Sequence, residues 1–183
     1  MNLPKIDSTS LPNAFAVTSG SLRVTDPCYD MDTWCAGTLE RVKNGIWQAH
    51  AGFHTDSHGW GTRVAYLHIR HENAQSHFDH EAEFDSTWVD SEIQVGVDSG
   101  QAGFFDYALF DQVCGSEPVK EKFYDEICAL TLGEEQWGVH PVGVVSSSGY
   151  GDGSYECLVR RDDEGRAIEA IIVYIGEYED EDD

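Results

Sequence analysis

Aspartate, serine and glycine gather in three short segments, in a pattern that the packing of a core does not require. The segments are SGSLRVTDPCY (19–29), VDSGQAGFFD (97–106) and SSSGYGDGSY (146–155). Each contains a short apolar piece and a turn signal, so we expect three loops at the ends of strands. Glycine lets backbone amides approach a ligand closely, and carboxylates are ligands for divalent cations. If the loops converge, they form one site for a small molecule or a metal ion.

The candidate ligand-binding residues in these loops are Asp26, Tyr29, Asp98, Ser99, Gly100, Gln101, Asp106, Ser148, Gly151, Asp152 and Tyr155. The candidate metal ligands among them are Asp98, Asp106 and Asp152. The first two are predicted to flank one loop, and Asp152 lies between two glycines in another. The alternative is that the glycines make turns and the aspartates cap backbone amides. The spacing matches neither a calcium-binding EF-hand nor a dinucleotide fingerprint, so the cofactor stays open, with a divalent cation as the candidate.

Cysteine and histidine offer further chemistry. Cys28 is a nucleophile only if a histidine base lies nearby in space, and the alternative is an inert packing thiol. Three histidine pairs with a spacing of three or four residues allow a zinc hypothesis: His54 with His58, His68 with His71, and His77 with His80. No HExxH motif accompanies them, so surface histidines are the alternative. Neither GxSxG nor a P-loop motif is present, which disfavours the corresponding enzyme classes.

The elements that must position these residues are mostly strands. Segment 38–53 alternates in polarity on both sides of Asn44-Gly45, which predicts a tight β-hairpin. Apolar residues at helical spacing predict one helix near 119–132, which Gly133 can terminate. Alternating βαβ units are absent. The fold class predicted is therefore α+β and predominantly antiparallel β, as a sandwich or a partly open barrel.

Length and composition favour one domain. The 183 residues are predicted to divide into an irregular lead-in (1–13), a single β-rich domain (14–176) and an acidic tail (177–183). No export signal and no apolar window of membrane-spanning length is visible, so we expect no membrane association. The five cysteines are widely spaced and odd in number. They favour reduced thiols and a cytoplasmic location.

The charge balance limits the partners. The chain has 34 acidic residues against 11 Lys and Arg, for a formal charge of −23. This charge opposes direct binding to nucleic acids and favours a cation, a small molecule or a basic protein surface as the partner. It is explained either by solubility or by imitation of a polyanion that occupies a basic surface on another protein.

The chain resembles the bacterial and phage proteins grouped as domain of unknown function 4241. The resemblance runs from about Ser19 to Ile175, and its most specific pieces are VDSGQAG (97–103) and SGYGDGSY (148–155). It implies a compact, mostly β domain without an assigned activity, and it assigns no catalytic residue.

Three functional hypotheses follow. The first is a domain that binds a small molecule or a divalent metal ion through the three loops. The second is a metal-dependent hydrolase of a phosphoester or a nucleotide, in which at least two carboxylates hold one ion. The third is an acidic phage or bacterial inhibitor protein that mimics a polyanion.

Overall fold

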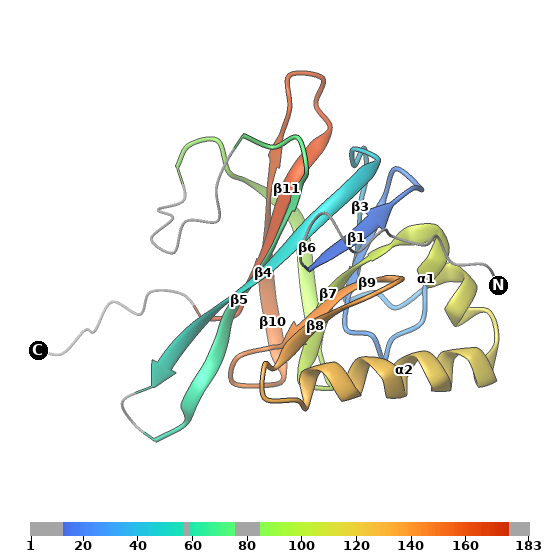
Figure 1. Cartoon of the computed structure of the whole chain (residues 1–183), viewed down its shortest axis with the longest axis vertical. Coiled ribbons are helices and arrows are strands. Elements are labelled where there is room, and N and C mark those ends of the chain that lie inside the picture. The colour runs from blue at the N-terminus through green and yellow to red at the C-terminus, as the bar shows by residue number, and fades with distance from the viewer. Residues whose placement is uncertain (1–12, 57–58, 76–84, 176–183) are drawn as a thin grey trace, which may run out of the picture.

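In the part of the chain that the structure describes, the protein is built from two antiparallel β-sheets and two helices (Figure 1). The computed structural model describes residues 13–56, 59–75 and 85–175. Sheet A has the strand order β1–β4–β5–β11–β10–β6, and sheet B has the order β3–β2–β7–β9–β8. The strands of sheet A are β1 (Ala14–Val17), β4 (Gly45–Asp56), β5 (Gly61–His71), β11 (Ala167–Val173), β10 (Gly153–Arg161) and β6 (Val89–Val97). Those of sheet B are β3 (Gly37–Leu39), β2 (Leu22–Thr25), β7 (Gln101–Asp106), β9 (Gly143–Ser147) and β8 (Trp137–His140).

The main core lies between the two sheets. Successive side chains of a strand point to opposite faces, so every second residue of a central strand enters this core. Phe104 and Val144 of sheet B are fully buried there, together with Leu67 and Ile172 of sheet A. The two sheets therefore form a sandwich, which is not closed into a barrel. This confirms the predicted α+β class in its sandwich form.

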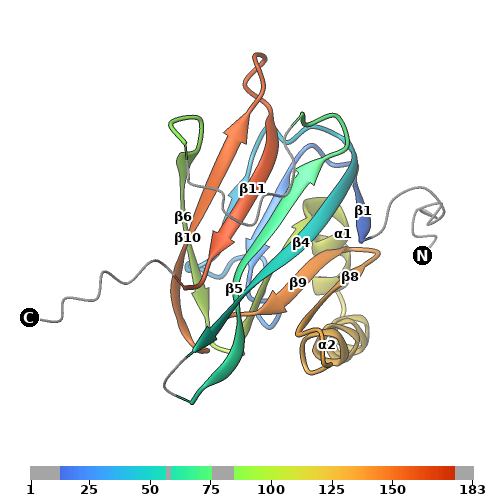
Figure 2. The ribbon, with the colours of Figure 1, turned by 60° about the vertical axis from the view of Figure 1, so that its left-hand side comes forward.

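The helices α1 (Tyr107–Cys114) and α2 (Glu117–Thr131) cover the outer face of sheet B. Figure 2 shows them on the side of β8 and β9 that faces away from β10 and β11. Phe105 of β7 stacks on Phe110 of α1, with ring centroids 5.0 Å apart, and both rings contact Phe123 of α2 edge-on. This second cluster fixes the helices against the sheet.

The helix predicted near 119–132 is α2, but α1 is an additional helix that the sequence analysis did not predict. Its N-cap is Asp106, whose side chain accepts a hydrogen bond from the Leu109 N–H at 3.1 Å. The segment 101–106 was predicted as part of a loop and is strand β7. The missed signal was the aspartate, because Asp is a preferred N-cap residue at the start of a helix.

The hairpin predicted around Asn44-Gly45 is wrong. Strand β3 pairs with β2 in sheet B, whereas β4 pairs with β1 and β5 in sheet A. Gly45 does adopt a positive φ of 141°, but the chain crosses there from one sheet to the other. The Asn44 side chain accepts a hydrogen bond from the Gly20 N–H at 2.8 Å, so this turn is tied to a neighbouring loop. The hairpin in this region is formed by β4 and β5.

The irregular lead-in lies outside the described residues except for Asn13, and the acidic tail lies outside them entirely. Within the described part of the chain, neither helix has the length and apolar character that crossing a bilayer requires.

Candidate functional site

The three predicted loops meet at one end of sheet B. Strand β2 ends where β7 begins, since Thr25 pairs with Gly103, and β9 ends beside β7, since Ser147 pairs with Gln101. The connections 26–29, 98–100 and 148–152 therefore lie next to one another, beside the C-terminal part of α2 (Figure 1). The Ser148 N–H donates to the Gly100 carbonyl at 3.0 Å, which joins two of them directly. We call these residues, together with Gln101, the three-loop end.

Asp26 holds two of these loops together. Its carboxylate is fully buried and accepts the Cys28 N–H at 2.9 Å and the Ser99 hydroxyl at 2.6 Å on Oδ1. Its Oδ2 accepts the N–H groups of Asp98 at 2.9 Å and Ser99 at 2.7 Å. Four hydrogen bonds satisfy the carboxylate, because an ionised carboxylate has about four lone-pair sites. Asp26 is thus the organising residue of the site rather than a group that points toward solvent.

Cys28, Tyr29 and Ser99 of the three-loop end carry a thiol or a hydroxyl group and are half buried. Burial and then a hydrogen bond to Asp26 raise the pKa of the Cys28 thiol to about 12. Burial also raises the pKa of the Tyr29 hydroxyl, and its contacts with Cys35 and Asp98 add to this shift. The thiol and the phenol therefore stay protonated at neutral pH. This raised pKa disfavours Cys28 as a nucleophile at neutral pH, because a thiolate is the reactive form.

Helix α2 contributes residues that the sequence analysis did not include. Gln101 is buried, and its amide nitrogen donates to the Cys128 sulfur at 3.4 Å. Its amide oxygen accepts the Thr131 hydroxyl at 2.7 Å. Burial raises the pKa of Tyr124, whose hydroxyl also interacts with Ser99 and Cys128. Tyr124 and Cys128 are four residues apart and so lie on one face of the helix, which was the available signal.

The third loop is a closed turn. The Ser148 hydroxyl donates to the Gly151 carbonyl at 2.8 Å, and the Gly151 N–H returns a bond to Ser148 at 3.1 Å. The Tyr155 hydroxyl lies 3.0 Å from the Ser148 carbonyl and 2.6 Å from that of Gly151. Positive φ angles at Gly149 (62°) and Gly151 (112°) make this turn possible. Asp152 follows it and is exposed, so Tyr155 has a supporting role and Asp152 faces solvent.

Asp106 lies at the opposite end of β7 from Ser99. It pairs with Leu22, and its buried carboxylate accepts the N–H groups of Thr18 at 2.7 Å and Ser19 at 3.0 Å, besides capping α1. The structure therefore brings together ten of the predicted site residues and separates Asp106 from them. Within residues 13–56, 59–75 and 85–175, no group of three or more His, Cys, Asp or Glu side chains is placed to hold a metal ion.

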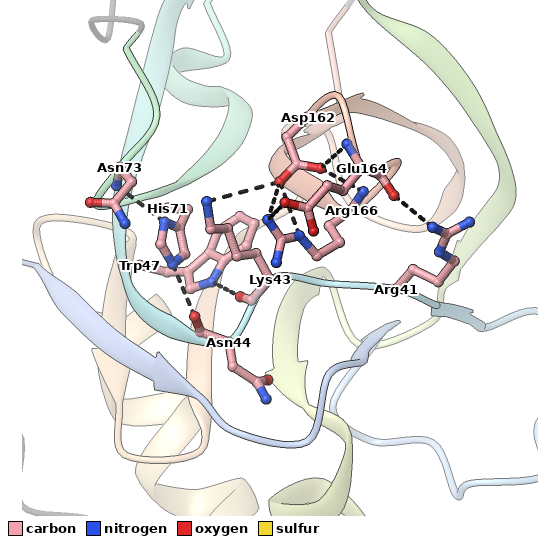
Figure 3. Close-up of polar contacts among 9 residues, drawn as sticks. All are labelled: Arg41, Lys43, Asn44, Trp47, His71, Asn73, Asp162, Glu164 and Arg166. Carbon is pink, nitrogen blue, oxygen red and sulfur yellow. Dashed lines mark hydrogen bonds and ion pairs between the residues drawn. The ribbon is translucent and has the colours of Figure 1, made fainter.

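His71 and His68 each have local partners. His71 is buried against Trp47, with ring centroids 5.7 Å apart, and its pKa is lowered by burial. Its Nδ1 accepts the Asn73 N–H at 3.1 Å, and Nε2 lies 3.1 Å from the Asn44 carbonyl (Figure 3). One neutral tautomer satisfies both contacts. His68 lies on the other face of β5, with Nε2 3.4 Å from the Glu169 carboxylate, so these two histidines do not share a ligand.

Of the other predicted histidine pairs, His54 belongs to β4, whereas His58, His77 and His80 lie outside the described residues.

A second polar cluster lies at the tip of the β10–β11 hairpin (Figure 3). The Asp162 carboxylate accepts the N–H groups of Glu164 at 3.0 Å and Arg166 at 2.9 Å, and it also binds the Arg166 guanidinium at 2.9 Å. These bonds, the backbone bond from Arg166 first, lower the pKa of Asp162. The carboxylate is occupied in closing a turn at Gly165, so this cluster has a structural role.

The sequence was also compared with known proteins. The family described as "Protein of unknown function (DUF4241)" matches residues 15–172. No curated protein and no solved structure matches the chain significantly.

Proposed function

Because this chain belongs to the DUF4241 family, whose function is unknown, we propose its function from its own geometry: it binds a small polar organic molecule at the three-loop end. One observation carries the proposal. Half-buried neutral polar groups from two loops and one helix meet there, among them the Cys28 thiol and the hydroxyls of Ser99 and Tyr124. A few convergent polar groups on a pre-formed surface are typical of small-molecule sites.

The placement of the carboxylates supports an organic ligand over a divalent cation. A metal ion needs several oxygen ligands within about 2.6 Å. Asp106 is at the far end of β7, and the Asp26 carboxylate already accepts four hydrogen bonds. A hydrolase that holds its metal through Asp98, Asp106 and Asp152 would need a rearrangement of β7. The organic ligand requires no such change.

Thermal unfolding tests the proposal. A compound that binds the native state raises the midpoint of unfolding, by an amount that grows with its concentration. We expect a panel of uncharged polar metabolites to include a stabilising compound whose effect is lost in Ser99→Ala and in Tyr124→Phe. Tyr107→Phe is the matched control, because Tyr107 lies on α1 away from the three-loop end.

The proposal fails if no compound of the panel raises the midpoint, or if the stabilisation survives both substitutions. A shift caused by a divalent cation alone, lost in Asp98→Asn, would restore the metal hypothesis in place of the organic ligand.

A second candidate function is the acidic inhibitor, and α2 favours it. Glu117, Glu121 and Asp125 are exposed and follow one another at intervals of four residues, about 6 Å along the helix. Such a row presents regularly spaced negative charge to a basic partner. The probe is a polylysine peptide. Its binding should weaken steeply with salt and should fall when the three acids become amides.

The matched control neutralises Glu134, Glu135 and Asp163, which are equally exposed and lie elsewhere. Equal losses in the two triple variants would mean that net charge alone binds the peptide, and the helix row would then have no specific role.

A further inference from the structure

Two exposed aromatic residues meet at the three-loop end. Trp60 comes from the tip of the β4–β5 hairpin and Tyr150 from the β9–β10 connection. Their ring centroids are 5.9 Å apart at an interplanar angle of 72°. Trp60 is 60% exposed and Tyr150 41% exposed, so much of both rings faces solvent. Two segments far apart in the sequence thus present one aromatic surface, which we call the Trp60–Tyr150 platform.

Hydrogen bonds fix the backbone next to both rings. Tyr150 lies inside the closed turn between Ser148 and Gly151. The Trp60 carbonyl accepts a bond from the Arg63 guanidinium at 2.8 Å. Next to it, the Gln136 amide donates to the Thr62 carbonyl at 3.0 Å, which ties the hairpin to the loop after α2. An ordered aromatic surface costs less entropy to use in binding than one on a mobile loop.

The space around the platform is open. Gly59 and Gly61 flank Trp60, Gly151 follows Tyr150, and Gly100 belongs to the adjacent loop. A Cβ atom built on any of these four glycines would meet no other atom within 4 Å. Asp98 and Asp152 are exposed beside the same loops. The platform therefore combines apolar ring faces, free volume and hydrogen-bond acceptors.

We propose that the Trp60–Tyr150 platform stacks an uncharged ring ligand that carries hydroxyl groups, as a neutral sugar or a nucleoside does. This inference rests on the proposed function and names its ligand class. Tryptophan and tyrosine offer a large apolar face for the ring. Asp98 and Asp152 accept hydrogen bonds from its hydroxyls. The same two carboxylates repel a phosphate, which excludes the charged nucleotides as preferred ligands.

Tryptophan fluorescence and calorimetry test the inference on the full chain. The probes are neutral monosaccharides and disaccharides, the common nucleosides, and the 5′-monophosphates of those nucleosides. We expect binding by members of one neutral class, sugars or nucleosides. If nucleosides bind, their 5′-monophosphates should bind at least about tenfold more weakly at low salt, because carboxylates and phosphate repel each other.

Trp60→Ala and Tyr150→Ala should each weaken this binding roughly tenfold, the loss expected when one stacking ring is removed. The matched control is Tyr107→Ala. Tyr107 is 38% exposed and begins α1, at the end of β7 opposite to the three-loop end. This control should bind within about twofold of the unsubstituted protein, since surface substitutions away from a site have small effects.

Two outcomes overturn the inference. Binding that is lost in Ser99→Ala but unchanged in Trp60→Ala and Tyr150→Ala refutes the role of the platform and leaves the proposed function intact. Binding of a small molecule from outside the neutral ring classes likewise refutes the ligand class of the platform and leaves the proposed function intact. Absence of binding by all compounds, including the metabolite panel above, refutes the proposed function together with the platform.

Discussion

Replacing Asp26 by asparagine should destabilise the protein more than any other isosteric change at the three-loop end. The substitution preserves the shape of the side chain and removes its charge. It also turns one acceptor oxygen into an NH₂ group that must face two donors. If that oxygen is Oδ2, the opposed donors are the N–H groups of Asp98 and Ser99, and if it is Oδ1, they are the Cys28 N–H and the Ser99 hydroxyl.

The magnitude follows from these bonds. A hydrogen bond to a charged group contributes about 1.5–3 kcal/mol net, and two such bonds are lost in either orientation. Asp26 is fully buried, so water does not replace them. We expect the free energy of unfolding to fall by about 3–6 kcal/mol. For a chain of 183 residues each kcal/mol shifts the midpoint by about 2–4 °C, which gives a drop of roughly 10 °C.

Urea denaturation followed by tryptophan fluorescence, with calorimetry for the thermal midpoint, measures this loss. The control is Asp152→Asn, which makes the same change of charge on an exposed residue and should stay within about 0.5 kcal/mol. If Asp26→Asn unfolds at the same urea concentration as the unsubstituted protein, the reasoning is refuted. The four hydrogen bonds would then contribute nothing that the amide cannot replace.

Three further predictions concern single residues. His71 has a pKa lowered by burial, so it binds a proton less readily in the folded state than in the unfolded one. The contribution of His71 to the free energy of unfolding should therefore be fully present above about pH 6.5 and should decrease as the pH falls below that value. An NMR titration of His71 in the folded protein should have its midpoint below about pH 6.5. The pKa of Cys28 is raised to about 12, so its thiol should react with iodoacetamide at pH 8 at least about hundredfold more slowly in the folded protein than in urea. Mass spectrometry of the peptide that contains Cys28 measures both rates. Gly100→Ala should lower the free energy of unfolding by only about 1–2 kcal/mol in urea denaturation, because Gly100 has a φ of 72° with open space around it. Gly103→Ala should lower it much more, because the added Cβ would collide with the Val144 carbonyl. Equal losses for the two variants would contradict this reasoning.

The sequence predicted elements that depend on local patterns. Helix α2 followed from apolar residues at helical spacing. The three loops were recognised because aspartate, serine and glycine mark chain reversals. Each of these features is decided by a few consecutive residues, so their own preferences suffice.

The roles of the aspartates needed the fold. In the sequence, Asp26 and Asp106 look alike, and both follow a short apolar segment. In the structure, both carboxylates are buried and bind backbone amides, but Asp26 lies at the three-loop end and Asp106 at the other end of sheet B. Only the strand register separates them, because Gly103 pairs with Thr25 and Asp106 with Leu22.

The antiparallel β character, helix α2, the strong negative charge and the chain reversals at the three-loop end follow from the residues of each segment. Tertiary structure decided that β3 and β4 belong to different sheets, that the three loops converge with α2, and that Trp60 meets Tyr150. The physical reason is the range of the interactions. Turns and helices are stabilised within a few residues, whereas strand partners are chosen by which faces can be buried together, and residues distant in the chain take part in that choice.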